Sequence, residues 1–204
     1  RVLVDLKRPI INYFYLYNAC EIEGFPPYIE PELKGQSNIL DIADSFIVSS
    51  ECPIEEKFQE KAFYSPIDDK ITLPLRKYFK SDEAFLGTLL HEMSHSTGNE
   101  KRLNRDIKNI FGTEKYALEE LTAELSCVFL EAELDMDIDF TRQDHINYFN
   151  SWINALKNDP NELYKVCSNA SKSCSRLMDN YEKVIVFENK IEKTNDEKEF
   201  EEVI

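Results

Sequence analysis

Five residues, His91-Glu92-Met93-Ser94-His95, form an HExxH motif inside an apolar segment with helical spacing. Positions i and i+4 of an α-helix share a face, so the imidazoles of His91 and His95 can bind one metal ion. Zinc is the usual ion at such a motif, and Glu92 is then placed to act as the general base of a peptidase. The chain has only three histidines, and this motif uses two of them. The motif therefore predicts a zinc-dependent metallopeptidase.

A third protein ligand is expected, because catalytic zinc usually has three of them and a water. The segment Glu119-Glu120-Leu121-Thr122-Ala123-Glu124 offers three carboxylates. One large class of HExxH enzymes takes its third ligand from a glutamate that is followed three residues later by a small residue and then an acid, and Glu120 has this spacing. Glu119 is the competing ligand, and Glu124 is expected to accept a hydrogen bond from a ligand imidazole. The alternative for all three carboxylates is a solvated helix face, and the HExxH motif favours the metal site.

The third histidine, His145, lies in the first turn of a later predicted helix, and Tyr148 follows it by three positions. Peptide hydrolysis needs a donor for the developing oxyanion, and either side chain could supply it. The alternative is a surface or capping histidine beside a packed tyrosine. Both interpretations stay open at the level of sequence.

Local signals place the HExxH motif on a helix. Ser81 is a good N-cap, and Asp82 and Glu83 follow it in the first turn, where acids are favoured. Gly98 predicts the end of the helix. The apolar residues between these limits recur at helical spacing and are Phe85, Leu86, Leu89, Leu90 and Met93. The motif is thus expected near the C-terminal end of a buried amphipathic helix.

The segment before this helix predicts a small sheet. A short helix is expected over 38–44 and a strand over 46–48, followed by a hairpin of 61–64 and 70–74 around a turn at 65–69. Because Pro74 cannot continue a ladder of hydrogen bonds, 70–74 is predicted to be an edge strand. We expect residues 70–73 to flank the cleft and to pair with an extended substrate.

The segment after the motif predicts helices. Thr113 is expected to cap one, Thr141 to open another, and Asp159-Pro160 to start a last long helix that ends near Phe187. A sheet before the motif and helices after it make the fold class α+β. The predicted division is an N-terminal segment 1–60, a remnant of or link to an upstream domain, packed on a catalytic domain 61–187. Residues 188–204, with seven acids and three lysines, are expected to be a disordered or frayed tail.

Composition limits the function classes. A net charge of −15 argues against a nucleic-acid-binding surface, and either solubility or attraction of a basic partner accounts for it. No segment is apolar and long enough to span a membrane, and no signal peptide is visible. The five cysteines are scattered and odd in number, which indicates buried thiols in a reducing cytosol. We expect one compact, cytoplasmic catalytic domain.

An ordered series of motifs runs through the chain. It comprises Tyr64–Pro74 (YSPIDDKITLP), Leu89–Gly98 (LLHEMSHSTG), Arg102-Leu-Asn-Arg105, Tyr116–Leu125 and the segment from His145 to Asp159. This series resembles the metallopeptidase domain of ArdC-type antirestriction proteins, which also occurs in polyvalent proteins of phages and plasmids. The resemblance covers roughly residues 10–180. It implies a zincin-like, gluzincin-type α+β fold with a small mixed sheet and a helix bundle. It also implies His91, His95 and Glu120 as zinc ligands and Glu92 as the base.

The resemblance further implies a role in a mobile element. Such proteins are similar to factors that protect incoming DNA from host restriction, so a protein or peptide substrate and a host restriction or defence protein are the expected partners. A non-catalytic alternative is an antirestriction binding protein, in which zinc stabilises the scaffold and the acidic surface engages the partner. A toxin or effector peptidase is a third possibility, which the lack of a secretion signal disfavours.

Overall fold

The computed structural model describes residues 23–24, 38–107, 113–136, 152–154 and 156–202, with side chains up to residue 190. The chain divides into two compact units, Arg1–Gln36 and Ser37–Ile204. Of the first unit only residues 23–24 are described, and they form a turn. The second unit contains the helices and the sheet, so α1 and β1 belong to it although they lie within the predicted N-terminal segment 1–60.

The sheet has three strands, β1 (Ile54–Lys57), β2 (Phe63–Ser65) and β3 (Lys70–Pro74), in the order β1-β3-β2. The predicted hairpin is confirmed, since β2 pairs antiparallel with β3. The prediction that β3 is an edge strand is wrong, because β1 pairs parallel with its other side and Lys57 lies opposite Pro74, the last residue of β3. β3 therefore has no free edge for a substrate, and the pairing predicted for residues 70–73 is excluded.

Helix α1 (Ile39–Ser49) begins after Asn38, whose side chain accepts a hydrogen bond from the Leu40 backbone N–H. The strand predicted over 46–48 is wrong, because α1 continues through these residues. Phe46 is fully buried and stacks on Tyr181 of the last helix at 4.4 Å between ring centroids. A short apolar run suits a strand or a buried helix equally well. Here the run is helical, and the helix makes the contact between Phe46 and Tyr181.

Helix α2 (Asp82–Ser96) carries the HExxH motif, and its predicted start is confirmed. Ser81 Oγ accepts a hydrogen bond from the Ala84 backbone N–H, and a short 3₁₀ turn, η2 (Arg76–Tyr78), precedes it. Most faces of α2 are buried, because it packs against α1, the sheet, α3 and α5. The hydroxyl of Ser94, inside the motif, is satisfied by the Leu90 carbonyl at 2.8 Å. A helix enclosed in this way holds its side chains in fixed positions.

Helix α3 (Glu114–Glu133) is capped by Thr113 as predicted, and the last helix is α5 (Glu162–Glu202). The predicted end of α5 near Phe187 is wrong, since the helix continues to Glu202. Residues 152–154 and 156–158 are helical, and the predicted start of that helix at Thr141 lies outside the described residues.

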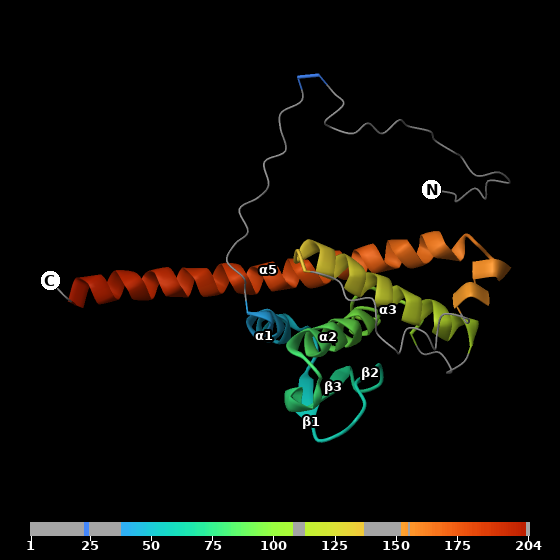
Figure 1. The fold of residues 1–204 in the computed structure, drawn as a ribbon, viewed down its shortest axis with the longest axis horizontal. Coiled ribbons are helices and arrows are strands. Elements are labelled where there is room, and N and C mark those ends of the chain that lie inside the picture. The colour runs from blue at the N-terminus through green and yellow to red at the C-terminus, as the bar shows by residue number, and fades with distance from the viewer. Residues whose placement is uncertain (1–22, 25–37, 108–112, 137–151, 155, 203–204) are drawn as a thin grey trace. The chain divides into compact units, whose positions relative to one another are not determined.

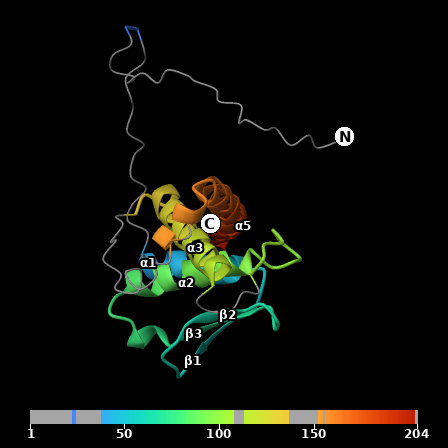
Figure 2. The ribbon, with the colours of Figure 1, turned by 90° about the vertical axis from the view of Figure 1, so that its right-hand side faces the viewer.

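Helix α2 lies between the sheet on one side and α3 on the other, in two views at right angles (Figures 1 and 2). The core joins buried residues of α1, α2, α3, α5 and the sheet. Cys52, Cys127 and Cys174 are buried and form no disulfide among the described residues, Cys167 is partly exposed, and Cys20 lies outside the described residues. Among the described residues, no helix combines the length and apolarity needed to cross a bilayer. The α+β class with a small mixed sheet is confirmed.

Candidate metal centre

Three side chains from α2 and α3 converge at one point. The Nε2 atoms of His91 and His95 lie 3.1 Å apart, and each is 3.6 Å from an oxygen of Glu120. The candidate ligand atoms of the three residues all lie within 4.8 Å of one another. The i, i+4 spacing on α2 places both imidazoles toward α3, where Glu120 is buried. Two imidazole nitrogens and one carboxylate thus face one small volume.

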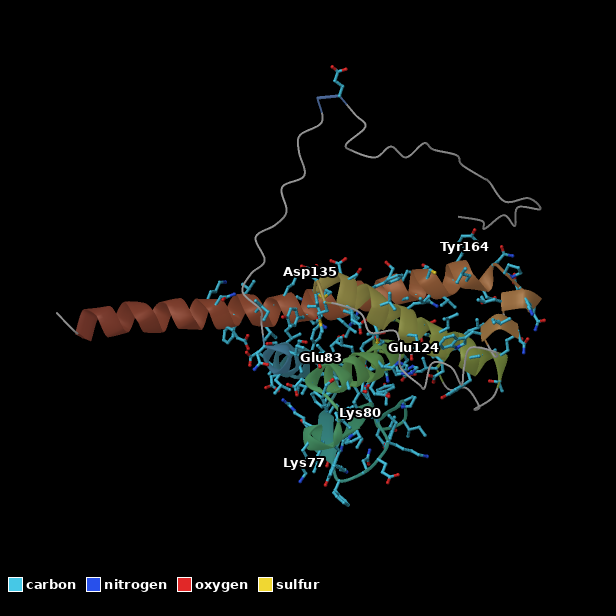
Figure 3. The ribbon with its side chains drawn as sticks, in the orientation of Figure 1. Lys77, Lys80, Glu83, Glu124, Asp135 and Tyr164 are labelled. Carbon is cyan, nitrogen blue, oxygen red and sulfur yellow. The ribbon has the colours of Figure 1, made fainter. Side chains whose placement is uncertain are left out.

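The outer nitrogens of the two imidazoles face two further carboxylates of α3. His95 Nδ1 is hydrogen-bonded to Glu119 Oε1 at 3.2 Å. His91 Nδ1 lies 3.2 Å from Glu124 Oε1, within ion-pairing distance but without the alignment of a hydrogen bond. Glu124 is labelled on α3 in Figure 3. A carboxylate on Nδ1 turns the lone pair of Nε2 toward the shared volume, which is the usual arrangement behind a metal-binding histidine.

Glu119 is held in turn by Arg105, which follows α2 in the chain. The guanidinium makes two parallel hydrogen bonds to the carboxylate, Nε to Oε2 at 3.0 Å and Nη2 to Oε1 at 2.7 Å. Arg105 also donates to Thr97 Oγ1 and to the Ser94 carbonyl at the end of α2. Its side chain is only 5% exposed, so the ion pair is shielded from water. One buried arginine therefore ties the end of α2 to α3.

The charges of this cluster shift several pKa values. Burial opposes protonation of His91, but Cys127, Glu120 and Glu124 outweigh it and hold the pKa well above its usual range. Burial likewise opposes protonation of His95, but Glu119 and Glu120 raise its pKa to about 9. Burial raises the pKa of the Glu120 carboxyl, yet the two imidazoles that face it outweigh this effect and keep the pKa well below its ordinary value.

The residues present suit a divalent cation. Three carboxylates surround two imidazoles in a buried cluster, and the negative charge that raises the pKa of the histidines attracts a cation equally well. Two nitrogens and one carboxylate are a donor set of zinc enzymes, and imidazole and carboxylate also bind other transition metals. Among the described residues this is the one cluster with metal-ligand geometry.

A cleft of about 1690 Å³ opens beside the cluster and is lined by His91, Glu92, His95, Glu119 and Glu120. Glu92 follows His91 on α2 and is 8% exposed. No hydrogen bond or ion pair of its carboxylate is seen among the described residues, whereas the other carboxylates of the cluster face imidazoles. Glu92 therefore lies on the wall of the cleft, and its role as a general base stays a prediction.

Another part of the cleft wall is formed by β2, the loop before it and the segment before α2. Exposed aromatic side chains gather there, with Phe58 83%, Tyr78 50% and Phe63 46% exposed. Phe58 and Tyr78 form an edge-to-face pair with ring centroids 5.6 Å apart. Lys80 lines the same wall and is labelled, with Lys77 and Glu83, in Figure 3. Exposed apolar side chains in a cleft are typical of a binding surface.

The β2–β3 turn is fixed to the end of α2. Tyr64 Oη donates to Asp69 Oδ1 at 2.8 Å and accepts from Asn99 Nδ2 at 2.8 Å. Arg102, with a side chain 4% exposed, forms an ion pair with Asp69 and donates from Nε to the Ser96 carbonyl at 2.7 Å. Tyr64 of the predicted hairpin and Asp69 of its predicted turn thus belong to a network that holds the sheet against α2.

The remaining predicted site residues, His145 and Tyr148, lie outside the described residues, so their role in oxyanion binding stays a prediction. Sequence reasoning missed Arg105, although it belongs to the quoted motif Arg102-Leu-Asn-Arg105. A pair of arginines just after a motif helix was the available signal. The sequence predicts Glu119 only as a rival ligand, and the structure places it on Nδ1 of His95 instead.

Comparison with known families agrees with this geometry. A family model described as a zincin-like metallopeptidase matches residues 41–169, more than half of the chain. The chain belongs to this zincin-like family. The match begins inside α1 and ends inside α5, so it spans both helices of the metal cluster and the sheet. The predicted family and fold are thereby confirmed.

Curated relatives of the zincin-like chain include two proteins from Escherichia coli named DNA primase TraC. One is 36% identical over 169 residues, which is 83% of this chain and 12% of the relative. The other is 37% identical over 173 residues, which is 84% of this chain and 16% of the relative. The protein y4eC of Sinorhizobium fredii is 30% identical over 166 residues, 81% of this chain and 53% of the relative. The chain thus spans a small part of the primases and about half of y4eC.

The solved structures similar to this zincin-like chain include the antirestriction protein ArdC from plasmid R388. Its Mn(II)-bound structure superposes with a TM-score of 0.68 at 31% identity, covering 81% of this chain and 60% of ArdC. The metal-free structure of ArdC gives 0.66 at 32% identity, covering 82% and 60%. A protein of the same fold has therefore been crystallised both with and without a divalent metal.

Proposed function

We propose that this chain is a zinc-dependent metallopeptidase domain that acts in the cytoplasm on protein or peptide substrates. The observation that carries the proposal is the convergence of His91, His95 and Glu120 within 4.8 Å at the side of a cleft, with Glu92 next to the first histidine. Family membership adds support, because the matching model describes zincin-like metallopeptidases.

In this proposal His91, His95 and Glu120 hold the ion. When bound there, zinc would supply Lewis acidity to a water molecule and to the carbonyl oxygen of the substrate. Glu92 accepts the proton of the attacking water and then delivers it to the leaving amine, so it acts first as a base and then as an acid. Glu119 and Glu124 orient the imidazoles from their Nδ1 sides.

The substrate is proposed to lie along β2, because the order β1-β3-β2 leaves the outer side of β2 as an edge of the described sheet. An extended chain can add to such an edge through main-chain hydrogen bonds. Phe58, Phe63 and Tyr78 on the same wall of the cleft would contact bulky apolar side chains of that substrate. His145 and Tyr148 remain proposed donors to the developing oxyanion.

The test is a Glu92→Gln variant of the full chain. It removes the base, keeps the volume of the side chain and leaves the three proposed ligands unchanged. We expect elemental analysis to find the same zinc content as in the wild type, and hydrolysis of a casein-derived peptide mixture to fall by about 10²–10⁴-fold. Glu131→Gln, on α3 at the same cleft, is the matched control. Equal turnover by Glu92→Gln and the wild type would refute the proposal.

A second candidate function is non-catalytic antirestriction, which the similarity to ArdC of plasmid R388 favours. In that case the metal stabilises the scaffold, and the acidic surface binds a host restriction or defence protein. The two candidates differ in cells that receive unmodified plasmid DNA. If catalysis is needed, Glu92→Gln loses protection against restriction; if binding suffices, Glu92→Gln protects as well as the wild type while His91→Ala does not.

A further inference from the structure

Two consecutive glutamates of α3 reach the imidazoles of α2, but they lie on different nitrogens. Glu120 lies 3.6 Å from both Nε2 atoms, whereas Glu119 is bonded to Nδ1 of His95. Both side chains are about equally buried, with exposed fractions of 10%. Neither chemistry nor burial distinguishes them as ligands, so something else in the structure must hold them apart.

Arg105 is the residue that distinguishes them. Its guanidinium binds both oxygens of Glu119 through Nε and Nη2, at 3.0 and 2.7 Å. Its remaining donors reach Thr97 Oγ1 at 2.7 Å and the Ser94 carbonyl at 2.8 Å. Thr97 Oγ1 is itself hydrogen-bonded to Ser173 Oγ of α5 at 2.9 Å. The position of the guanidinium is therefore fixed by α2, the loop after it and α3. Helix α5 supports it indirectly, through the hydrogen bond between Ser173 and Thr97.

We infer that Arg105 is a positioning residue that selects the metal ligands. By holding Glu119 on Nδ1 of His95, it keeps that carboxylate away from the ion, leaves Glu120 as the carboxylate ligand and turns Nε2 of His95 toward the metal. This inference rests on the metal site proposed above, but not on peptidase activity. It assigns a task to a buried arginine that lies outside the ligand set.

The geometry explains why an arginine is needed here. A guanidinium can bind both oxygens of one carboxylate with two parallel hydrogen bonds, whereas the ammonium of lysine is a point charge that fixes no plane. A Cβ at Gly98 would lie 2.5 Å from Cγ2 of Ile107 and 3.1 Å from Nη2 of Arg105. The turn after α2 is thus packed closely against both side chains.

Loss of Arg105 would leave the Glu119 carboxylate buried without its bidentate partner. Burying an unpaired charge is costly, so the carboxylate is expected to turn to the nearest cation. In the metal-bound protein that cation is the ion itself, and Glu119 would enter the ligand set. His95 would then lose the hydrogen bond that orients its ring.

The same loop supplies a matched control in Arg102. Its side chain is 4% exposed and it donates from Nε to the Ser96 carbonyl at the end of α2, much as Arg105 donates to Ser94. Its carboxylate partner is Asp69 in the β2–β3 turn, away from the metal cluster. Arg102→Ala therefore removes an equally buried arginine and leaves Glu119 in place.

The experiment is a titration of the metal-free full chain with Co²⁺, whose visible absorption reports the number and type of ligands. We expect Arg105→Ala to bind Co²⁺ about 10–100-fold more weakly and with a changed absorption spectrum, because it alters an outer partner of a ligand. Arg102→Ala should lower the thermal midpoint similarly and keep the wild-type Co²⁺ affinity and spectrum. Arg105→Lys, which keeps the charge, tests the same point if Arg105→Ala does not fold.

A double variant separates ligand selection from general damage. In Arg105→Ala/Glu119→Gln the released carboxylate is gone, so the spectrum should return toward that of the wild type. The inference is overturned if both Arg105 variants give the wild-type affinity and spectrum, or if Arg102→Ala changes the spectrum as much as Arg105→Ala does. If the wild type itself binds no Co²⁺, the metal site proposed above fails, which is a different result.

Discussion

At the scale of single residues, neighbouring side chains of one chemical type take different tasks. Glu119, Glu120 and Glu124 all reach the HExxH helix, but only Glu120 faces both Nε2 atoms. Glu119 and Glu124 lie at the Nδ1 atoms of His95 and His91. The partner of each carboxylate, more than its type, determines whether it can be a ligand.

Substitutions of these glutamates should distinguish the metal ligand from the residues that orient the histidines. We expect Glu120→Gln to lower zinc affinity by at least about 100-fold, roughly one ligand's share of a structural zinc site. Glu119→Gln should lower it by about tenfold, because it weakens only the orientation of His95. Competition with a chromophoric chelator measures both, and Glu131→Gln, seven positions beyond Glu124 on α3, serves as a control. The reverse order of the two effects would make Glu119 the ligand.

At the scale of elements, the β2–β3 turn is held on the end of α2 by the pair of Asp69 and Arg102. Asp69 has a positive φ of 49°, a backbone conformation that asparagine also adopts readily. Burial raises the pKa of Asp69, but hydrogen bonds from Arg102 and Tyr64 outweigh it, so the carboxyl titrates below its ordinary value of 3.8. Its charge therefore stabilises the folded state.

An Asp69→Asn variant removes this charge without straining the turn. We expect the free energy of unfolding at pH 7 to fall by about 2–3 kcal/mol, because a buried arginine loses its ionised partner. Since the folded pKa is depressed, the advantage of the wild type is present at neutral pH and disappears as the pH falls through that pKa. Urea denaturation at pH 7 and near pH 3 measures it. Asp68→Asn, in the same turn but exposed, should have little effect at either pH.

The elements that are correctly predicted from the sequence are determined by interactions between residues close together in the chain. Ser81 and Thr113 cap α2 and α3 through side-chain bonds to backbone N–H groups three residues on. The strand predicted over 46–48 failed because Phe46-Ile47-Val48 lacks a period that separates strand from helix. β1 (Ile54–Lys57) was missed because three of its four residues are charged and its pairing with β3 is distant in sequence.

In the candidate site, too, local sequence patterns predict some residues and not others. HExxH could be predicted because helical spacing determines which side chains share a face, and Glu120 because it has the third-ligand spacing of one class of HExxH enzymes. The positions of Glu119 and Arg105 could not, because their ion pair joins residues 14 positions apart, and Arg105 directly follows Asn104, whose backbone has a positive φ of 51°. Such a loop conformation follows from tertiary packing, which no local pattern in the sequence records.

At the scale of the whole molecule, the metal cluster joins α2 and α3, and α2 contacts α1, α5 and the sheet as well. Zinc that binds the folded state alone should therefore stabilise the entire unit 37–204. At a free zinc concentration 100 times Kd, linkage gives about 2.7 kcal/mol, which raises Tm by about 5–10 °C for a domain of this size. Thermal unfolding with and without zinc measures the shift. Glu120→Gln should show little shift at the same zinc concentration, and an equal shift there would place the ion elsewhere.

The brevity of β2 has a consequence for self-association. An open strand edge is a template on which identical chains can polymerise, and proteins guard such edges by keeping them short or interrupting them with proline. β2 has three residues, and Pro66 follows directly after Ser65. Such a short edge offers another polypeptide few main-chain hydrogen bonds, which protects the molecule against fibre growth. A polypeptide that docks there must then be chosen mainly by its side chains.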